Sequence, residues 1–278
     1  MLRLLPLFVL LLISYSCKQK IATSKDPIPK HQSLKLYSDI LNEERMINIW
    51  TPPTYDTKKQ RLPVLYMPDG GIKEDFPHIA NTLARLIESN KIPPFILVGI
   101  ENTERGRDLT GESQIKEHEE YGIPMEDGAK DFRAFIQKEL IPRIESTYRC
   151  TEKRGIIGES LAGLFIMETF FLQPQLFNYY IAMDPSFWWN DNVLVKHAEE
   201  HLQNLPERET RLWFAGSNTV DIKEYTDQLG EFLAKRETKN LNWHYSPEPK
   251  EKHHTIYRAC KKKALIWTLG SKEGIQNR

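Results

Sequence analysis

The sequence predicts a single α/β domain built on a mostly parallel, doubly wound sheet that is preceded by antiparallel strands. Two observations carry this prediction. Apolar runs without a polar face, such as "LPVLYMP" at 62–68 and "PFILVGIE" at 94–101, are typical of strands buried on both sides in a parallel sheet. Strand and helix patterns then alternate to the end of the chain without a Pro/Gly/Ser-rich break. A chain of 278 residues can form one domain of this kind.

The first 16 residues have the pattern of an export signal. Met1–Arg3 supplies a positive charge, and the apolar stretch 4–13 is too short to span a bilayer as a mature helix. Cys17 follows small residues, as at a bacterial lipoprotein cleavage site, although Ser14 stands where leucine is usual. We expect an exported, periplasmic or outer-membrane-associated lipoprotein whose lipidated Cys17 begins a polar tether over 17–32. Cleavage by an ordinary signal peptidase is the alternative.

The expected folded domain covers residues 33–272 and leaves a short tail, 273–278. It opens with two strands, "SLKLYSDIL" and "RMINIWTPP", of which the second alternates in a two-residue period. Residues 102–126 are polar and without a clear period, and a loop of this length in a compact domain is often functional. The helix expected over 129–148 should be kinked by Pro142. The other expected helices cover 78–89, 161–172, 191–204, 221–236 and 255–269, and the other strands 154–158, 178–183, 211–215 and 241–246.

Charge and cysteine content limit the partners. The 38 basic and 38 acidic side chains give no net charge and form no basic stripe, so nucleic acid is not an expected partner. In an exported protein Cys150 and Cys260 could form a disulfide, or could be two separately buried thiols. Neither this choice nor the oligomeric state follows from the sequence.

Ser160 is the candidate nucleophile. It lies in Gly158-Glu159-Ser160-Leu161-Ala162-Gly163, directly after a predicted strand and before a predicted helix. A strand, a sharp turn and a helix are the context in which a nucleophile elbow lifts a serine hydroxyl above the sheet edge. A helix N-cap is the alternative role for Ser160. Because an N-cap does not require glycine two residues earlier, we favour the nucleophile.

A serine nucleophile of this kind has an acid and then a histidine after it in the chain. His253 and His254 lie in "PEPKEKHHTIYRAC", between the last strand and the last helix, and we choose His253 as the base. Asp221 follows the strand "RLWFA" and is the expected acid. It could instead be only the N-cap of the next helix, in a protein that uses a Ser–His dyad.

The expected oxyanion hole consists of two backbone N–H groups. One comes from Leu161, the residue after the nucleophile. The other comes from the turn "MPDGGIKED", where Gly70 and Gly71 allow the backbone to approach a ligand closely and where Ile72 could also be the donor. A plain turn with two glycines is the alternative.

With these residues placed, the chain resembles the putative-esterase family of α/β-hydrolases, which includes siderophore esterases, S-formylglutathione hydrolases and feruloyl esterases. The similarity covers about residues 33–269 and depends on "LPVLYMPDGG", "ILVGIENTERGRDLT", "GESLAGLF", "FNYYIAMDPSFWW" and "HHTIY". It implies an α/β-hydrolase fold and a serine esterase that needs no metal or organic cofactor. Ala162 replaces the usual glycine of the elbow, and Asp184 stands where relatives commonly have serine. Asp184 could change the charge of the pocket.

The resemblance also suggests a substrate surface. Arg105, Arg107, Trp188 and Trp189 could hold an acyl or aryl group by stacking and by charge-assisted hydrogen bonds, or could form local ion pairs and core contacts. The leading hypothesis is an exported, siderophore-esterase-like serine hydrolase acting through an acyl-enzyme on a small-molecule or glycan-linked ester. The alternatives are an acylated-polysaccharide esterase, an acyltransferase on the same site, and a lipid-anchored binding protein without catalysis.

Overall fold

The computed structural model describes residues 26–203 and 205–270. The expected signal segment, Cys17, the first part of the tether and the C-terminal tail lie outside these residues. Within the described ranges, no helix combines the length and the apolar character that crossing a membrane requires.

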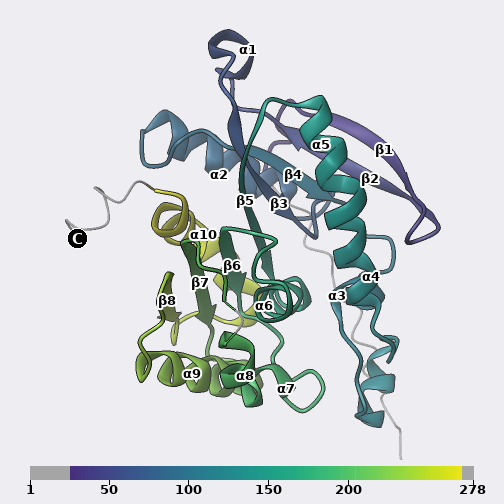
Figure 1. Cartoon of the computed structure of the whole chain (residues 1–278), viewed down its shortest axis with the longest axis vertical. Helices are drawn as coiled ribbons and strands as arrows, with labels where there is room; N and C mark the ends of the chain where they lie inside the picture. The colour runs from purple at the N-terminus through teal and green to yellow at the C-terminus, as the bar shows by residue number, and fades with distance from the viewer. Residues whose placement is uncertain (1–25, 204, 271–278) are drawn as a thin grey trace, which may run out of the picture.

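Eight strands form one sheet in the order β1-β2-β4-β3-β5-β6-β7-β8. Their bounds are β1 Gln32–Ser38, β2 Glu43–Trp50, β3 Leu62–Met67, β4 Ile96–Ile100, β5 Cys150–Glu159, β6 Tyr179–Met183, β7 Thr210–Gly216 and β8 Leu241–Pro247. β1 pairs with β2, and β2 with β4, in antiparallel register, whereas all pairs from β4 to β8 are parallel. Figure 1 shows the purple β1–β2 pair at one edge of the sheet and β8 at the other. The expected single-domain α/β architecture is confirmed.

Helices cover both faces of the sheet. They are α1 Tyr55–Lys58, α2 Phe76–Glu88, α3 Arg105–Leu109, α4 Gly128–Phe135, α5 Ile141–Thr147, α6 Leu161–Leu172, α7 Val193–Lys196, α8 Ala198–Leu202, α9 Val220–Ala234 and α10 His253–Leu269, with a 3-10 turn η1 at Lys116–Tyr121 and a π turn η2 at Ile136–Leu140. Val64 and Tyr66 of β3 pack in a core with α4, α5, α6 and α9, whereas Leu65 packs with α2 and α10. Because alternate residues of a strand face opposite ways, this arrangement requires the continuous apolar runs seen in the sequence.

Three local predictions differ from the structure. Residues 102–126 contain α3 and η1, so the expected loop is partly helical. The helix expected over 191–204 is two short helices, because Asp191 and Asn192 have left-handed backbone angles and His197 interrupts the rest. Near Pro142 the chain widens into η2 and then continues as α5. A proline has no N–H and crowds the carbonyl four residues before it, and a π turn relieves that conflict.

The two cysteines of the domain are both free and buried. Cys150 belongs to the core cluster on one face of the sheet and Cys260 to the cluster on the other face. The sheet therefore separates the two thiols, and the alternative of two separately buried cysteines is the one that the structure supports.

Candidate active site

Ser160 lies in the turn between β5 and α6 with φ of +62° and ψ of −122°. This region of backbone space is costly for a residue with a side chain, and strain of this kind is found at functional sites. Ser160 stands at the N-cap position of α6, but its side chain makes no capping hydrogen bond. Its N–H donates to the Met183 carbonyl at 3.0 Å, which extends the β5–β6 ladder into the turn. These observations favour the nucleophile over the capping role.

Small residues make the turn possible. A Cβ atom added to Gly158 would lie 2.7 Å from the Ala162 Cβ, and one added to Gly163 would lie 2.9 Å from the Met183 carbonyl oxygen. Both distances are shorter than carbon atoms tolerate. The glycines therefore allow α6 to pack directly on β5 and on the end of β6, and the alanine at position 162 fits because position 158 has no side chain.

His253 is the first residue of α10, and its two ring nitrogens contact Ser160 and Asp184. Its Nε2 lies 3.0 Å from Ser160 Oγ, and its Nδ1 lies 2.7 Å from Asp184 Oδ2. A carboxylate can only accept, so Nδ1 carries the hydrogen and Nε2 is free to accept the serine proton. The His253 side chain is 39% exposed, whereas the Asp184 side chain is fully buried. His254, the other candidate base, is exposed.

The prediction that Asp221 is the acid partner of His253 is wrong. It is exposed in the first turn of α9, and the carboxylate that contacts His253 belongs to Asp184. β6 lies next to β5 in the sheet, so the turn after β6 lies beside Ser160, whereas β7 is one strand further away. Asp184 has φ of +48° and donates its N–H to the Ala215 carbonyl at 2.9 Å. Its place directly after a buried strand is the signal in the sequence that could have identified it, whereas only an effect on the charge of the pocket was expected of Asp184.

In the turn after β3, the N–H groups of Gly70 and Gly71 have different partners. The Gly70 N–H donates to the Ile100 carbonyl at 2.9 Å, and a Cβ on Gly70 would lie 2.3 Å from Gly99 Cα. Gly70 is therefore required by the close approach of β4, and its N–H is not available to an oxyanion, which corrects that prediction. The Gly71 N–H donates to a side chain, Glu74 Oε2, at 2.6 Å. Leu161 supplies the first N–H of α6.

Two partly buried glutamates, Glu74 and Glu159, adjoin these groups. Burial raises the pKa of Glu74, and the nearby Asp69 charge raises it further, while the Gly71 N–H opposes the change. Burial also raises the pKa of Glu159, directly before Ser160, well above its ordinary value, and the carboxylates of Asp75 and Asp184 add to this effect. Both environments favour the neutral acid.

The four expected substrate contacts divide into two kinds. Arg105 forms a two-point ion pair with Asp69, and its Nη2 lies 3.5 Å from the Glu159 carbonyl oxygen, so this guanidinium borders the elbow. Arg107 instead bonds to Glu43 and Asp108, which is the local ion-pairing alternative.

The two tryptophans also differ. Trp189 is buried and donates its indole N–H to the Gly111 carbonyl at 2.9 Å, as a core residue does. Trp188 is partly buried and contacts His118 and Tyr121, with ring centroids 5.4 and 5.3 Å away. Tyr121, which is not among the residues expected from the sequence, is 64% exposed. Trp188 is thus the tryptophan that belongs to an accessible aromatic surface.

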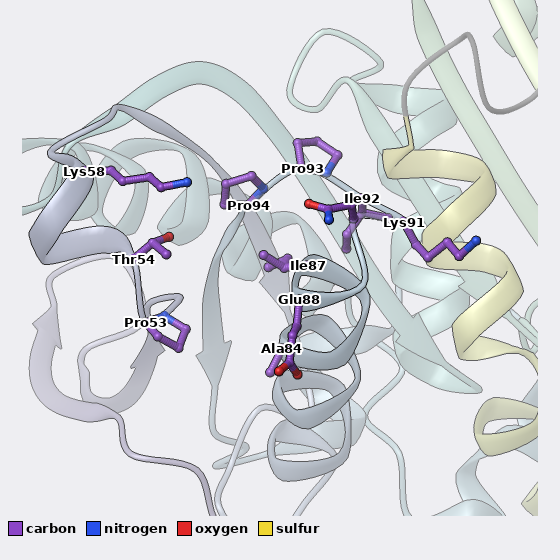
Figure 2. A pocket seen from close by; sticks show the side chains of 11 residues that line it. Pro53, Thr54, Lys58, Ala84, Ile87, Glu88, Lys91, Ile92, Pro93 and Pro94 are labelled. Atoms are coloured by element: carbon purple, nitrogen blue, oxygen red, sulfur yellow. The ribbon is translucent and has the colours of Figure 1, made fainter.

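A cavity of about 730 Å³ lies away from Ser160 (Figure 2). Its lining includes Pro53 after β2, Ile87 of α2, and Pro93 and Pro94 before β4. Because β4 and β5 run parallel, residues before β4 lie at the sheet edge opposite Ser160. This cavity is not connected with the arrangement around Ser160.

The family model described as putative esterase matches residues 38–259. The chain belongs to this family. The ferri-bacillibactin esterase BesA of Bacillus subtilis is 30% identical over 60% of this chain and 62% of its own length. The apo-salmochelin esterase of Escherichia coli is 24% identical over 59% of this chain and 55% of its own. The chain thus spans about three fifths of the length of these curated relatives.

Solved structures agree with the fold. An IroE-like serine hydrolase from Shewanella oneidensis has a TM-score of 0.74 at 28% identity, covering 86% of this chain and 79% of that one. The BES protein from Bacillus cereus has a TM-score of 0.75 at 24% identity, covering 89% and 98%. The resemblance predicted from the sequence is confirmed, as is the α/β-hydrolase fold.

Proposed function

We propose that this member of the esterase family is a serine carboxylic-ester hydrolase. The observation that carries the proposal is the continuous chain of contacts from Ser160 Oγ through His253 to the buried Asp184. The relatives named as esterases support the same chemistry. The strained backbone of Ser160 and its missing cap bond are what a nucleophile requires and a helix cap does not.

The reaction has two halves. In the first, His253 Nε2 removes the Ser160 proton while Oγ attacks the ester carbonyl, and the imidazolium then protonates the departing alcohol. In the second, Nε2 removes a proton from water, the hydroxide attacks the acyl-enzyme, and the proton returns to Ser160 as the carboxylic acid leaves. Asp184 fixes the Nδ1–H tautomer and stabilises the imidazolium in both halves.

The developing oxyanion needs two donors, and we assign them to the N–H groups of Leu161 and Gly71. Gly71 already donates to an oxygen of the Glu74 carboxyl group at 2.6 Å, so its N–H is directed at a side-chain oxygen and not at the backbone. For the ester to use this amide, the Glu74 side chain must rotate away. The raised pKa of Glu74 lowers the charge that it would present to the oxyanion.

The proposed substrate is an ester of the siderophore type. Support comes from relatives named as esterases of ferri-bacillibactin, apo-salmochelin and the siderophore triacetylfusarinine C. The aromatic surface of Trp188 and Tyr121 and the guanidinium of Arg105 offer stacking and hydrogen bonding to such molecules.

We further propose that the protein is exported and carries a lipid on Cys17. The short apolar segment and the cysteine after it support this proposal. Metabolic labelling with an alkynyl fatty acid should mark the wild-type protein and not the Cys17→Ala variant. Equal labelling of both would refute lipidation at this residue.

Ser160→Ala tests the catalytic proposal. We expect hydrolysis of p-nitrophenyl butyrate to fall by at least about 10³-fold, and a fluorophosphonate probe to label the wild type and not the variant. Ser246→Ala is the matched control, because Ser246 is a buried serine on β8, three strands away from β5, that bonds to Glu248. Undiminished turnover by Ser160→Ala would refute the proposal.

A further inference from the structure

The carboxylate of Asp184 is held by more than His253. Ser217 donates its backbone N–H to Asp184 Oδ1 at 2.5 Å and its hydroxyl to Asp184 Oδ2 at 2.8 Å. Oδ2 is also the oxygen that accepts the His253 Nδ1–H at 2.7 Å. One carboxylate oxygen therefore receives two donors, and the second donor comes from a residue that no step of the proposed reaction uses.

Ser217 follows β7, the same strand after which the acid Asp221 was expected. It follows β7 directly, in the loop that leads to α9, and it is completely buried. β6 and β7 pair in parallel with Met183 opposite Ala215, and the Asp184 N–H continues that ladder to the Ala215 carbonyl. The ends of the two strands thus bring the carboxylate and the hydroxyl to a fixed distance.

The Ser217 hydroxyl has a defined direction. The Thr219 N–H donates to Ser217 Oγ at 3.2 Å, and the Thr219 hydroxyl lies 3.0 Å away. A hydroxyl has a single hydrogen, and a charged carboxylate is a stronger acceptor than a neutral hydroxyl. The Ser217 hydrogen therefore points to Asp184, and the loop after β7 holds it there.

We propose that Ser217 is a positioning residue of the catalytic triad, which sets the orientation of the Asp184 carboxylate toward His253. This inference rests on the proposed function. Without the Ser217 hydroxyl the buried carboxylate is less well solvated, and Oδ2 keeps only its contact with His253. The imidazolium formed in each half of the reaction then loses part of its stabilisation, while substrate binding is unaffected.

A double-mutant cycle tests the inference. We expect Ser217→Ala to lower kcat for p-nitrophenyl butyrate by about tenfold, with KM within about twofold, as the loss of one charge-assisted hydrogen bond predicts. In the Asp184→Asn background, where no charge remains to be positioned, the same substitution should change kcat by less than about twofold. The acidic limb of the kcat/KM profile should also move in Ser217→Ala.

Ser246→Ala is the matched control. Ser246 is a buried serine on the neighbouring strand β8 and donates to a carboxylate, Glu248, at 2.6 Å. That carboxylate is not the one that contacts His253, so the control should leave kcat and the acidic limb unchanged. If Ser217→Ala does not fold, as judged by its thermal melt, Ser217→Cys keeps the volume with a weaker donor and replaces it in the cycle.

Three results would overturn the inference: wild-type kcat in Ser217→Ala, an unmoved acidic limb, or an equal loss of kcat in both backgrounds. Failure of the proposed function gives a different result, because Ser160→Ala would then retain full activity whatever Ser217 does. An inactive Ser160→Ala beside a fully active Ser217→Ala would refute only the positioning role.

Discussion

Asp184→Asn is the substitution that separates the acid seen in the structure from the acid expected from the sequence. The amide has nearly the shape of the carboxylate, so packing at this fully buried position is retained. It lacks the charge and presents an N–H where His253 Nδ1 now donates at 2.7 Å. The imidazole is then driven to the tautomer with hydrogen on Nε2, which cannot accept the Ser160 proton.

The expected loss follows from these two effects. A wrong tautomer together with an unstabilised imidazolium lowers kcat of triad hydrolases by about 10³ to 10⁴-fold, which corresponds to about 4–5.5 kcal/mol of transition-state stabilisation. KM should change by less than about threefold, because Asp184 is buried behind His253 and does not reach the substrate.

The assay is steady-state hydrolysis of p-nitrophenyl butyrate, with thermal melts to show that each variant is folded. Asp221→Asn is the matched control: it is the same chemical change at the exposed position in α9, and it should leave kcat within about twofold of the wild type. Full activity in Asp184→Asn, or a comparable loss in Asp221→Asn, would refute the assignment of the acid.

Two further predictions concern the turn that carries Ser160. Glu159→Gln should raise the melting temperature at pH 8 and have little effect at pH 4. Burial raises the pKa of Glu159 in the folded state well above the ordinary value of 4.5. As the pH rises above 4.5, the unfolded state therefore loses a proton that the folded state keeps, and the stability of the wild type falls. Thermal melts across this range measure the difference, and a pH-independent effect would contradict it. Gly158→Ala should lower the free energy of unfolding by about 1–3 kcal/mol through its 2.7 Å contact with the Ala162 methyl, and adding Ala162→Gly should recover most of the loss; urea unfolding that shows no recovery would disprove this explanation.

Much of the fold could be predicted because its main signals are local. The doubly buried runs of β3 and β4 have no polar face, and the motif around Ser160 combines a strand, a turn and a helix within a few residues. His253 followed from its place between the last strand and the last helix. These predictions needed only chain order and side-chain pattern.

The acid could not be chosen in this way. Asp184 and Asp221 both come after a parallel strand and both precede His253, so chain order allows either. The choice depends on which strand end lies beside Ser160 and on the donors that Ser217 supplies, and both are properties of the assembled sheet. Gly70 and Gly71 look equivalent in sequence, and only the approach of Gly99 distinguishes them.

The backbone bonds that continue the sheet ladder past Ser160 and Asp184 have a consequence for denaturation. Ser160 and Asp184 are attached to the ends of β5 and β6, in the middle of the eight-stranded sheet, where opening requires cooperative unfolding of the domain. His253 is attached instead to the first turn of α10 and is partly exposed, and helix ends fray at little cost. Under mild denaturing conditions His253 should therefore leave the site first. Activity should decline at lower denaturant concentration than the circular-dichroism signal of the sheet, and it should recover when the denaturant is removed.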